Sequence, residues 1–206
     1  MSDAAPLDLA AMTVGEYLDR LAAAVPVPGG GAVAGVTLAQ ANALGAMVVG
    51  YAIGKPKFAS HDGAHRAAYA ACEAGRYRAL ELAREDAAAY AVLNRLWKLP
   101  KDDPARAGFA QAVLAAIAAP EATLALATDT VAALGTLVGT TSASLASDLR
   151  IAFDLAMAAA NAAIENVRIN LPSLDDAALR DAIGARTEAR LGAIVQSASE
   201  WRAKVR

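Results

Sequence analysis

The sequence lacks the features that mark several common classes of protein. Cys72 is its one cysteine in 206 residues, so the chain cannot build a disulfide framework of its own and fits a reducing compartment. The net charge is −2, and no basic stripe is interleaved with aromatic residues, so we expect no nucleic-acid partner. Residues 1–12 carry no basic segment ahead of an apolar core, unlike a signal peptide. A cytoplasmic protein is therefore expected.

Strand patterns and nucleotide-binding motifs are also missing. No segment alternates apolar and polar residues with the period of two that strands require. The glycines at 29–31 follow a helical pattern and no Gly-Lys-Ser/Thr accompanies them, so they form neither a P-loop nor a dinucleotide fingerprint. Aromatic residues make up only 5% of the chain, whereas hydrophobic residues, many of them alanine, make up 56%. This composition favours helices that pack closely through small side chains.

Residues 25–58 form the stretch around which the chain is organised. They begin with Pro26 and Pro28, continue through three glycines, and reach Gly54 without a charged residue. A run this long could cross a bilayer, but it is rich in alanine and glycine, contains polar residues, and has no basic flank or tryptophan belt at its N-terminal end. We therefore expect a helix at the centre of a bundle rather than a membrane span.

The expected architecture is all-α, a single-domain bundle of about seven helices around this central Ala/Gly-rich helix. Residues 1–12 are expected to be a flexible N-terminus, and residues 13–206 the helical domain. Thr13 and Glu16 have capping-box spacing, Pro120 is expected to begin a new helix, and Asp176 caps the last one. The helices are expected at residues 13–25, 30–53, 60–97, 104–118, 120–139, 147–170 and 173–204.

Two carboxylates are the leading candidates for chemistry. Asp86 lies among charged residues of a helix, where a solvated acid is the usual case, yet it aligns with the apolar side, and burial would raise its pKa. Asp148 follows Ser147 at a helix start, where both could simply stabilise the helix terminus. Either acid could instead take part in proton transfer.

Lysines, amides and histidines give further candidates. Lys55 and Lys57 are either exposed helix-end charges or cations for an anionic ligand or proton transfer. Asn166 and Asn170 share a helix face, and buried amides need partners, which a ligand or backbone could supply. His61 and His65 have zinc-like spacing, but a third ligand with defined spacing is missing, so we expect no metal.

Three sequence blocks, in order, resemble the formiminotransferase-cyclodeaminase (cyclodeaminase domain) and methenyltetrahydrofolate cyclohydrolase family. The first is PVPGGGA at 26–32 with GKPKF at 54–58, which is similar to P-x-P-G-G-G-[SA] followed by a basic run. The second is DAAAY at 86–90 with LPK at 99–101, and the third is SDL at 147–149 with NVRINL at 166–171. Each block is weak alone, but together they are fairly specific.

The resemblance implies an α-helical homodimer that acts on a one-carbon adduct of tetrahydrofolate without a metal or redox cofactor. One family reaction closes 5-formiminotetrahydrofolate to the 5,10-methenyl form and releases ammonia, and another hydrolyses the methenyl bridge. By resemblance the catalytic residues would be Asp148, Asp86 and Lys55. The residues that bind substrate would be Pro28, Gly29, Gly30, Gly31, Lys57, Ser147, Asn166 and Asn170.

Two departures from the family pattern leave an alternative open. Pro56 interrupts the basic run, and Ser142 and Ser144 stand in a segment where many relatives carry an asparagine. The chain could therefore be a non-catalytic folate-binding protein, or a dimeric helical interaction protein, of the same fold. The glycines at 29–31 are expected to leave space for a flat pterin or its tail.

Overall fold

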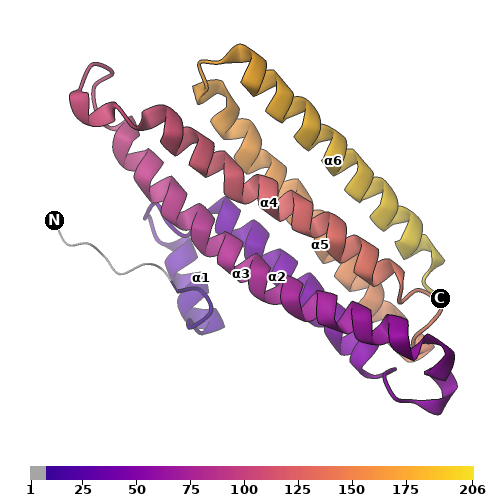
Figure 1. The fold of residues 1–206 in the computed structure, drawn as a ribbon. Helices are drawn as coiled ribbons and strands as arrows, with labels where there is room; N and C mark the ends of the chain where they lie inside the picture. Colours follow the sequence, from indigo (N-terminus) through magenta and orange to yellow (C-terminus); the bar gives the residue numbers. More distant parts are fainter. Residues whose placement is uncertain (1–7) are drawn as a thin grey trace.

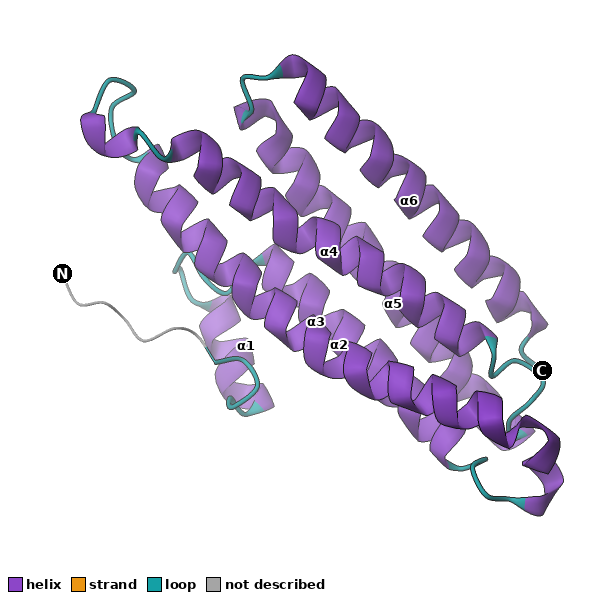
Figure 2. Ribbon diagram, viewed as in Figure 1, coloured by secondary structure: helices purple, strands orange, loops and turns teal. Residues whose placement is uncertain are grey.

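The structure is a computed structural model that describes residues 8–206. Within that range the chain folds into six α-helices, joined by loops and short 3₁₀ turns, and contains no strand (Figure 2). The all-α prediction is thus confirmed. The helices are α1 (Val14–Ala22), α2 (Gly30–Gly50), α3 (Asp62–Trp97), α4 (Phe109–Gly135), α5 (Ala146–Asn170) and α6 (Ala177–Lys204).

Helices α2 to α5 run side by side in alternating directions, and α6 packs along α4 and α5 (Figure 1). At one end of the bundle Gly30 lies beside Asn166 of α5, and Trp97 of α3 meets Phe109 of α4. We call this the Gly30 end. The opposite end, which we call the Lys55 end, holds the end of α2 and the starts of α3 and α5. The two ends are about 30 Å apart, because α2 has 21 residues that rise about 1.5 Å each.

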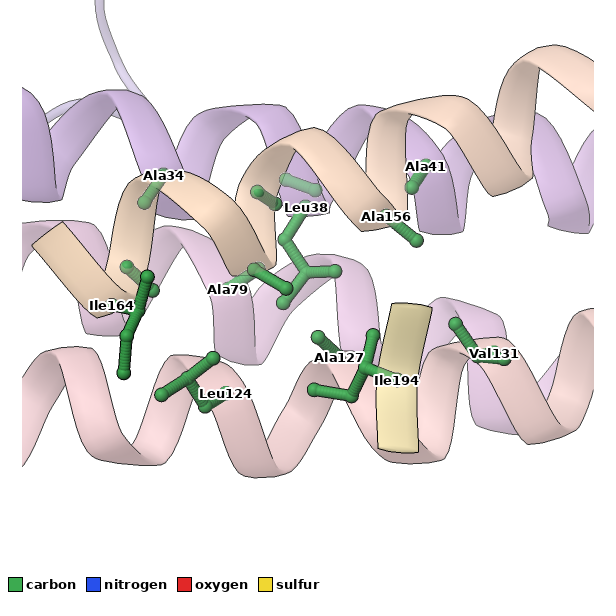
Figure 3. Close-up of a cluster of buried hydrophobic side chains, with 14 of the residues drawn as sticks. Ala34, Leu38, Ala41, Ala79, Leu124, Ala127, Val131, Ala156, Ile164 and Ile194 are labelled. Atoms are coloured by element: carbon green, nitrogen blue, oxygen red, sulfur yellow. The ribbon is translucent and has the colours of Figure 1, made fainter. Parts of the chain in front are cut away.

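Helix α2 packs mainly against α3 and α5, and it also contacts α4. Small side chains allow this: a Cβ atom on Gly35 would lie only 2.7 Å from the carbonyl oxygen of Ala79 in α3. Leu38 of α2 is fully buried in the cluster that Figure 3 shows, together with Leu124 of α4 and Ile164 of α5. Close backbone approach therefore replaces large side chains as the means of filling this core.

Among the described residues 8–206, two segments are long and apolar enough to cross a membrane by length and composition, namely Gly30–Gly50 and Pro104–Gly135. In the structure 61% of the first apolar window and 44% of the second are buried inside the protein. Helix α2 packs in the bundle against α3 and α5, but one of its faces borders an open groove, so it is a packed helix of the bundle rather than its enclosed centre.

The structure has one helix fewer than expected, because α4 continues through Pro120. Proline removes the N–H that would bond the carbonyl four residues earlier, here that of Ala116. Asn170 of α5 compensates, since its Nδ2 atom donates to the Ala116 oxygen over 3.5 Å. A partner 54 residues away in the sequence thus supplies the hydrogen bond that the helix lacks. The expected break at Pro120 was wrong for this reason.

Helix α1 stands apart from the bundle (Figure 1). Its capping box is confirmed: the Glu16 N–H donates to Thr13 Oγ1 over 3.2 Å, and the Thr13 N–H donates to Glu16 Oε2 over 2.7 Å. All nine residues of α1 are described, and none is buried. Ahead of it Leu9 packs against Ala32 and Ala83. The rest of the flexible N-terminus that we expected, residues 1–7, lies outside the described residues.

Candidate functional site

A cavity of about 290 Å³ opens at the Gly30 end of the bundle. The loop before α2 and the first turn of α2 form one side of it, through Pro26, Val27 and the three glycines. Helix α3 contributes Asp86, Tyr90 and Trp97, α4 contributes Ala116, and α5 contributes Asn166, Ile169 and Asn170. Segments from four parts of the sequence therefore converge on one hollow.

Asp86 is the acidic side chain of this cavity. It points inward from α3 because it shares the helix face that packs against α2. Burial raises the pKa of its carboxyl group to about 6, since a charged carboxylate loses much of its hydration there. An acid with such a pKa exchanges its proton readily near neutral pH, which suits a general acid or base.

Gly31 makes room for this carboxyl group. A Cβ atom at position 31 would overlap the Cγ atom and both carboxyl oxygens of Asp86. At the neighbouring Gly30 a Cβ atom would lie 3.4 Å from the Nδ2 atom of Asn166, which is a tight but possible contact. The glycines thus bring the start of α2 against side chains from α3 and α5.

The start of α2 also offers hydrogen-bond donors. Gly29 occupies the N-cap position, and no side chain of the described residues caps the helix there. The first N–H groups of a helix have no carbonyl partner within it, and they carry a partial positive charge. Because Gly29, Gly30 and Gly31 line the cavity, this helix terminus can receive a polar or anionic part of a ligand.

The two asparagines of α5 occupy the same cavity but make different contacts. Asn166 donates from Nδ2 to the Ala162 oxygen of its own helix over 2.8 Å. Asn170 is 4% exposed and donates to the oxygens of Asn166 and Ala116. Its Oδ1 atom is buried and has no hydrogen-bond partner among the described residues. A buried acceptor that lacks a donor marks a place where a ligand N–H group would be stabilised.

The structure brings together only part of the site that we predicted. Asp86, the glycines, Asn166 and Asn170 line the cavity, and Pro28 is buried in the loop beside it. Lys55, Lys57, Ser147 and Asp148 lie at the Lys55 end instead. Asp148 and Asn166 are 18 residues apart on α5, which corresponds to about 27 Å. One chain therefore holds two clusters of candidate residues at opposite ends of the same helices.

At the Lys55 end, Lys55, Lys57 and Ser147 are exposed, whereas Asp148 is half-buried in the first turn of α5. The three exposed side chains are accessible to another molecule, and Asp148 is partly accessible. This cluster lies outside the cavity that contains Asp86.

His65 of α3 makes a structural contact. His65 is fully buried, and its Nε2 atom lies 3.2 Å from the hydroxyl oxygen of Thr140. The pKa of His65 is lowered, mainly by burial, and the lowered pKa favours the neutral imidazole. In the part of the chain that the structure describes, no group of three or more His, Cys, Asp or Glu side chains could hold a metal ion.

Six lining residues had not been assigned to the site from the sequence: Pro26, Val27, Tyr90, Trp97, Ala116 and Ile169. Tyr90 and Trp97 follow Asp86 by four and eleven residues, so all three share one face of α3. That spacing was a usable signal once Asp86 had been selected. Ile169 stands in the NVRINL block between two predicted site residues, whereas nothing in the local sequence placed Ala116 at the cavity.

Comparison with known proteins identifies the family of this chain. The family model described as formiminotransferase-cyclodeaminase matches residues 13–189. The chain belongs to the formiminotransferase-cyclodeaminase family. The resemblance seen in the three sequence blocks is thus confirmed, and the family match spans both clusters of candidate residues.

Among solved structures, the chain is similar to a formiminotetrahydrofolate cyclodeaminase from Thermotoga maritima. The TM-score is 0.82 at 26% sequence identity, and the alignment covers 94% of this chain and 97% of the other. A search of curated proteins gave no significant match. The cyclodeaminase-family fold thus accounts for nearly the whole of the bundle, α6 included.

Proposed function

We propose that this cyclodeaminase-family chain is an enzyme that acts on the one-carbon bridge between N5 and N10 of tetrahydrofolate. The observation that carries the proposal is Asp86, a carboxyl group with a pKa raised to about 6 inside a cavity lined by a helix terminus and two carboxamides. The family membership and the structural neighbour support the folate substrate.

Hydrolysis of the 5,10-methenyl form would use the carboxylate. Asp86 takes a proton from water as the water oxygen attacks the cationic bridge carbon, and a tetrahedral carbon results. The bond from this carbon to N5 then breaks while the new hydroxyl group loses its proton to solvent and becomes the formyl oxygen. N5 takes the proton held by Asp86, and 10-formyltetrahydrofolate forms. Before the attack, the negative carboxylate also stabilises the positive charge of the bridge.

Closure of the 5-formimino form would use the protonated acid. N10 attacks the formimino carbon while its proton passes to the imine nitrogen, which gives a tetrahedral carbon that bears an amino group. Asp86 then protonates this amino group, which leaves as ammonia while the methenyl bridge remains. Carbon keeps its oxidation level in both reactions, so the proposal requires no redox cofactor. We also propose that no metal takes part, because a carboxyl group with this pKa can perform each proton transfer.

The direct test follows the near-ultraviolet absorbance of the methenyl bridge. Purified protein should speed its disappearance from the 5,10-methenyl form or its appearance from the 5-formimino form. Asp86→Asn should lower that rate by about 10²–10⁴-fold. Glu85→Gln is the matched control, since Glu85 is exposed and pairs with Arg78 outside the cavity. If the wild-type protein binds folate by calorimetry yet turns over neither substrate, it is a binding protein and the enzymatic proposal is wrong.

We further propose that the working form is a cytoplasmic homodimer. Helix α1 presents an amphipathic surface with no buried residue, and exposed Tyr51 and Tyr69 border a groove of about 470 Å³ over α2 and α3. A second copy packed antiparallel across this face would bring its Lys55 end beside the cavity of the first. Lys55, Lys57, Ser147 and Asp148 of one chain could then complete the site around Asp86 of the other.

The cytoplasmic part of the proposal is supported by Cys72. Its thiol is buried, and burial raises its pKa to about 11, which suits a thiol that stays reduced.

A further inference from the structure

One face of α3 changes in character along the cavity. Asp86, Tyr90 and Trp97 all line it, at spacings of four and seven residues. Asp86 and Tyr90 are partly buried, whereas Trp97 is 37% exposed and lies in the last turn of the helix. The cavity wall therefore runs from an acid inside to an aromatic ring at its mouth, over about 16 Å of helix.

Trp97 is held in place by other aromatic rings. Its ring centroid is 6.4 Å from that of Tyr90, with an interplanar angle of 72°, and also 6.4 Å from that of Phe109, at 56°. Phe109 is in turn covered by Arg106, whose guanidinium carbon lies 4.2 Å from the ring centroid. Arg106 also donates to the Leu99 oxygen over 3.0 Å, just beyond the end of α3. The indole is thus supported before any ligand arrives, which lowers the entropic cost of binding to it.

The two carboxamides of the cavity come from α5, across from the aromatic face of α3. Asn166 is beside Gly30, next to Gly31 and Asp86, and Asn170 carries the unpartnered Oδ1 atom. The remaining lining residues of α4 and α5, Ala116 and Ile169, are apolar. A ligand with one hydrogen-bonding edge and one plain aromatic ring would find a matching partner for each.

We propose that Tyr90 and Trp97 bind the p-aminobenzoyl ring of the folate substrate and so fix its direction in the cavity. This inference rests on the proposed function and goes beyond it. The pterin has N–H donors and acceptors on its edge and takes the carboxamide side, where Asn170 Oδ1 can accept. The p-aminobenzoyl ring has no polar edge and stacks on the aromatic wall. The reacting bridge joins the two rings and falls beside Asp86.

The chain offers a spectroscopic test with an internal control, because it has two tryptophans. Trp201 of α6 packs against Gly135 at the Lys55 end, away from the cavity. Protein labelled with ¹⁵N-tryptophan gives two indole N–H signals, which Trp97→Phe and Trp201→Phe assign. We expect p-aminobenzoylglutamate to shift the Trp97 signal and leave that of Trp201 unchanged. A 6-methyltetrahydropterin fragment should shift Trp97 much less. The proposal is wrong if p-aminobenzoylglutamate does not shift the Trp97 signal, or if the pterin fragment shifts it more.

Kinetics separate this inference from the proposed function. Trp97→Ala should raise KM about tenfold with kcat within about twofold, since a lost stacking contact weakens binding and leaves the proton transfer intact. Trp97→Phe keeps a flat ring and should recover most of the affinity, and Trp201→Phe should behave as wild type. If the wild type turns over substrate and Trp97→Ala leaves KM unchanged, the proposed binding of the p-aminobenzoyl ring by Trp97 is wrong, whereas the proposed function stands. If neither the wild type nor Trp201→Phe turns over substrate, the proposed function fails instead.

Discussion

The carboxyl group of Asp86 lies against the backbone of Gly31, so closely that any Cβ atom at position 31 would overlap it. From the sequence, the glycines were expected to leave space for the substrate. The structure gives Gly31 a more specific role, because it lets α3 bring an acid to the first turn of α2. The positions of the acid and of the helix terminus therefore depend on each other.

Two neighbouring glycine substitutions test this dependence. Gly31→Ala should displace the Asp86 side chain, destabilise the fold by about 1–3 kcal/mol and reduce turnover strongly. Gly30→Ala meets Asn166 at 3.4 Å, so small side-chain shifts can absorb it and the effect should be much milder. Urea unfolding and the methenyl absorbance assay measure both effects. Equal effects of the two substitutions would contradict the special role of Gly31.

The pH dependence of turnover should report the protonation of Asp86, whose pKa is raised to about 6. For hydrolysis, in which the carboxylate accepts a proton, kcat/KM should rise with pH through about 6 and then level off. For closure of the formimino form, in which the acid donates, kcat/KM should fall as pH rises above about 6. A profile that is flat between pH 5 and 7 would remove Asp86 from the proton transfer.

Asp86→Asn should stabilise the protein above pH 6. The pKa of Asp86 is raised on folding, from 3.8 to about 6, so the unprotonated carboxylate destabilises the folded state. The wild type is free of this penalty below about pH 4, acquires it between about pH 4 and pH 6, and carries it in full at higher pH. The variant should thus be more stable at pH 8, by up to about 3 kcal/mol, with a difference that vanishes towards pH 4. Thermal unfolding at both pH values measures it, and an Asp86→Asn protein less stable at pH 8 would contradict burial as the cause.

Mixed oligomers can show whether two chains share one site. Asp86→Asn and Asp148→Asn proteins should each be nearly inactive alone. After subunit exchange, half of the dimers contain one chain of each kind, and one of their two sites has both acids intact. The mixture should therefore recover about a quarter of wild-type activity. An Asp148→Asn protein with full activity would exclude Asp148 from the mechanism, and inactive parents that recover nothing on mixing would exclude the shared site.

A double-mutant cycle can measure the link between Pro120 and Asn170. Asn170→Ala leaves the buried Ala116 oxygen without a donor, which should cost about 1–3 kcal/mol in the free energy of unfolding. In a Pro120→Ala background the helix regains an N–H for this oxygen, so the same substitution should cost about 1 kcal/mol less. Asn161→Ala is the matched control, because Asn161 is exposed and bonds only to Met157 of its own helix in the described structure. Full additivity of Pro120→Ala and Asn170→Ala would show that the contact carries no energy.

Local rules in the sequence account for much of the fold. The capping box at Thr13 and the cap at Asp176 both form as expected, because each depends on residues within one helical turn. The break at Pro120 failed, because its rescue comes from a different helix. A rule that reads neighbouring residues cannot detect a donor so distant in the chain.

The same limit applies to the site. Asp86 and the glycines were identified by their motifs, and the structure places them together. Trp97 lies on the same face of α3 but was not selected, because its place at the cavity depends on how α4 and α5 pack. The separation of Asp148 from Asp86 likewise follows from the directions of the helices, which motif spacing alone does not give.

The long uncharged helix α2 has a consequence for synthesis of the protein. It leaves the ribosome early, whereas α5, one of the helices that cover it, is completed only at Asn170. At bacterial or eukaryotic translation rates this delay is on the order of ten seconds. During that time the apolar surface of α2 is not yet covered by α5, so it resembles the exposed surface of a nascent membrane segment. Chaperones that bind apolar helices should therefore engage the nascent chain, and fragments that stop before α5 should aggregate.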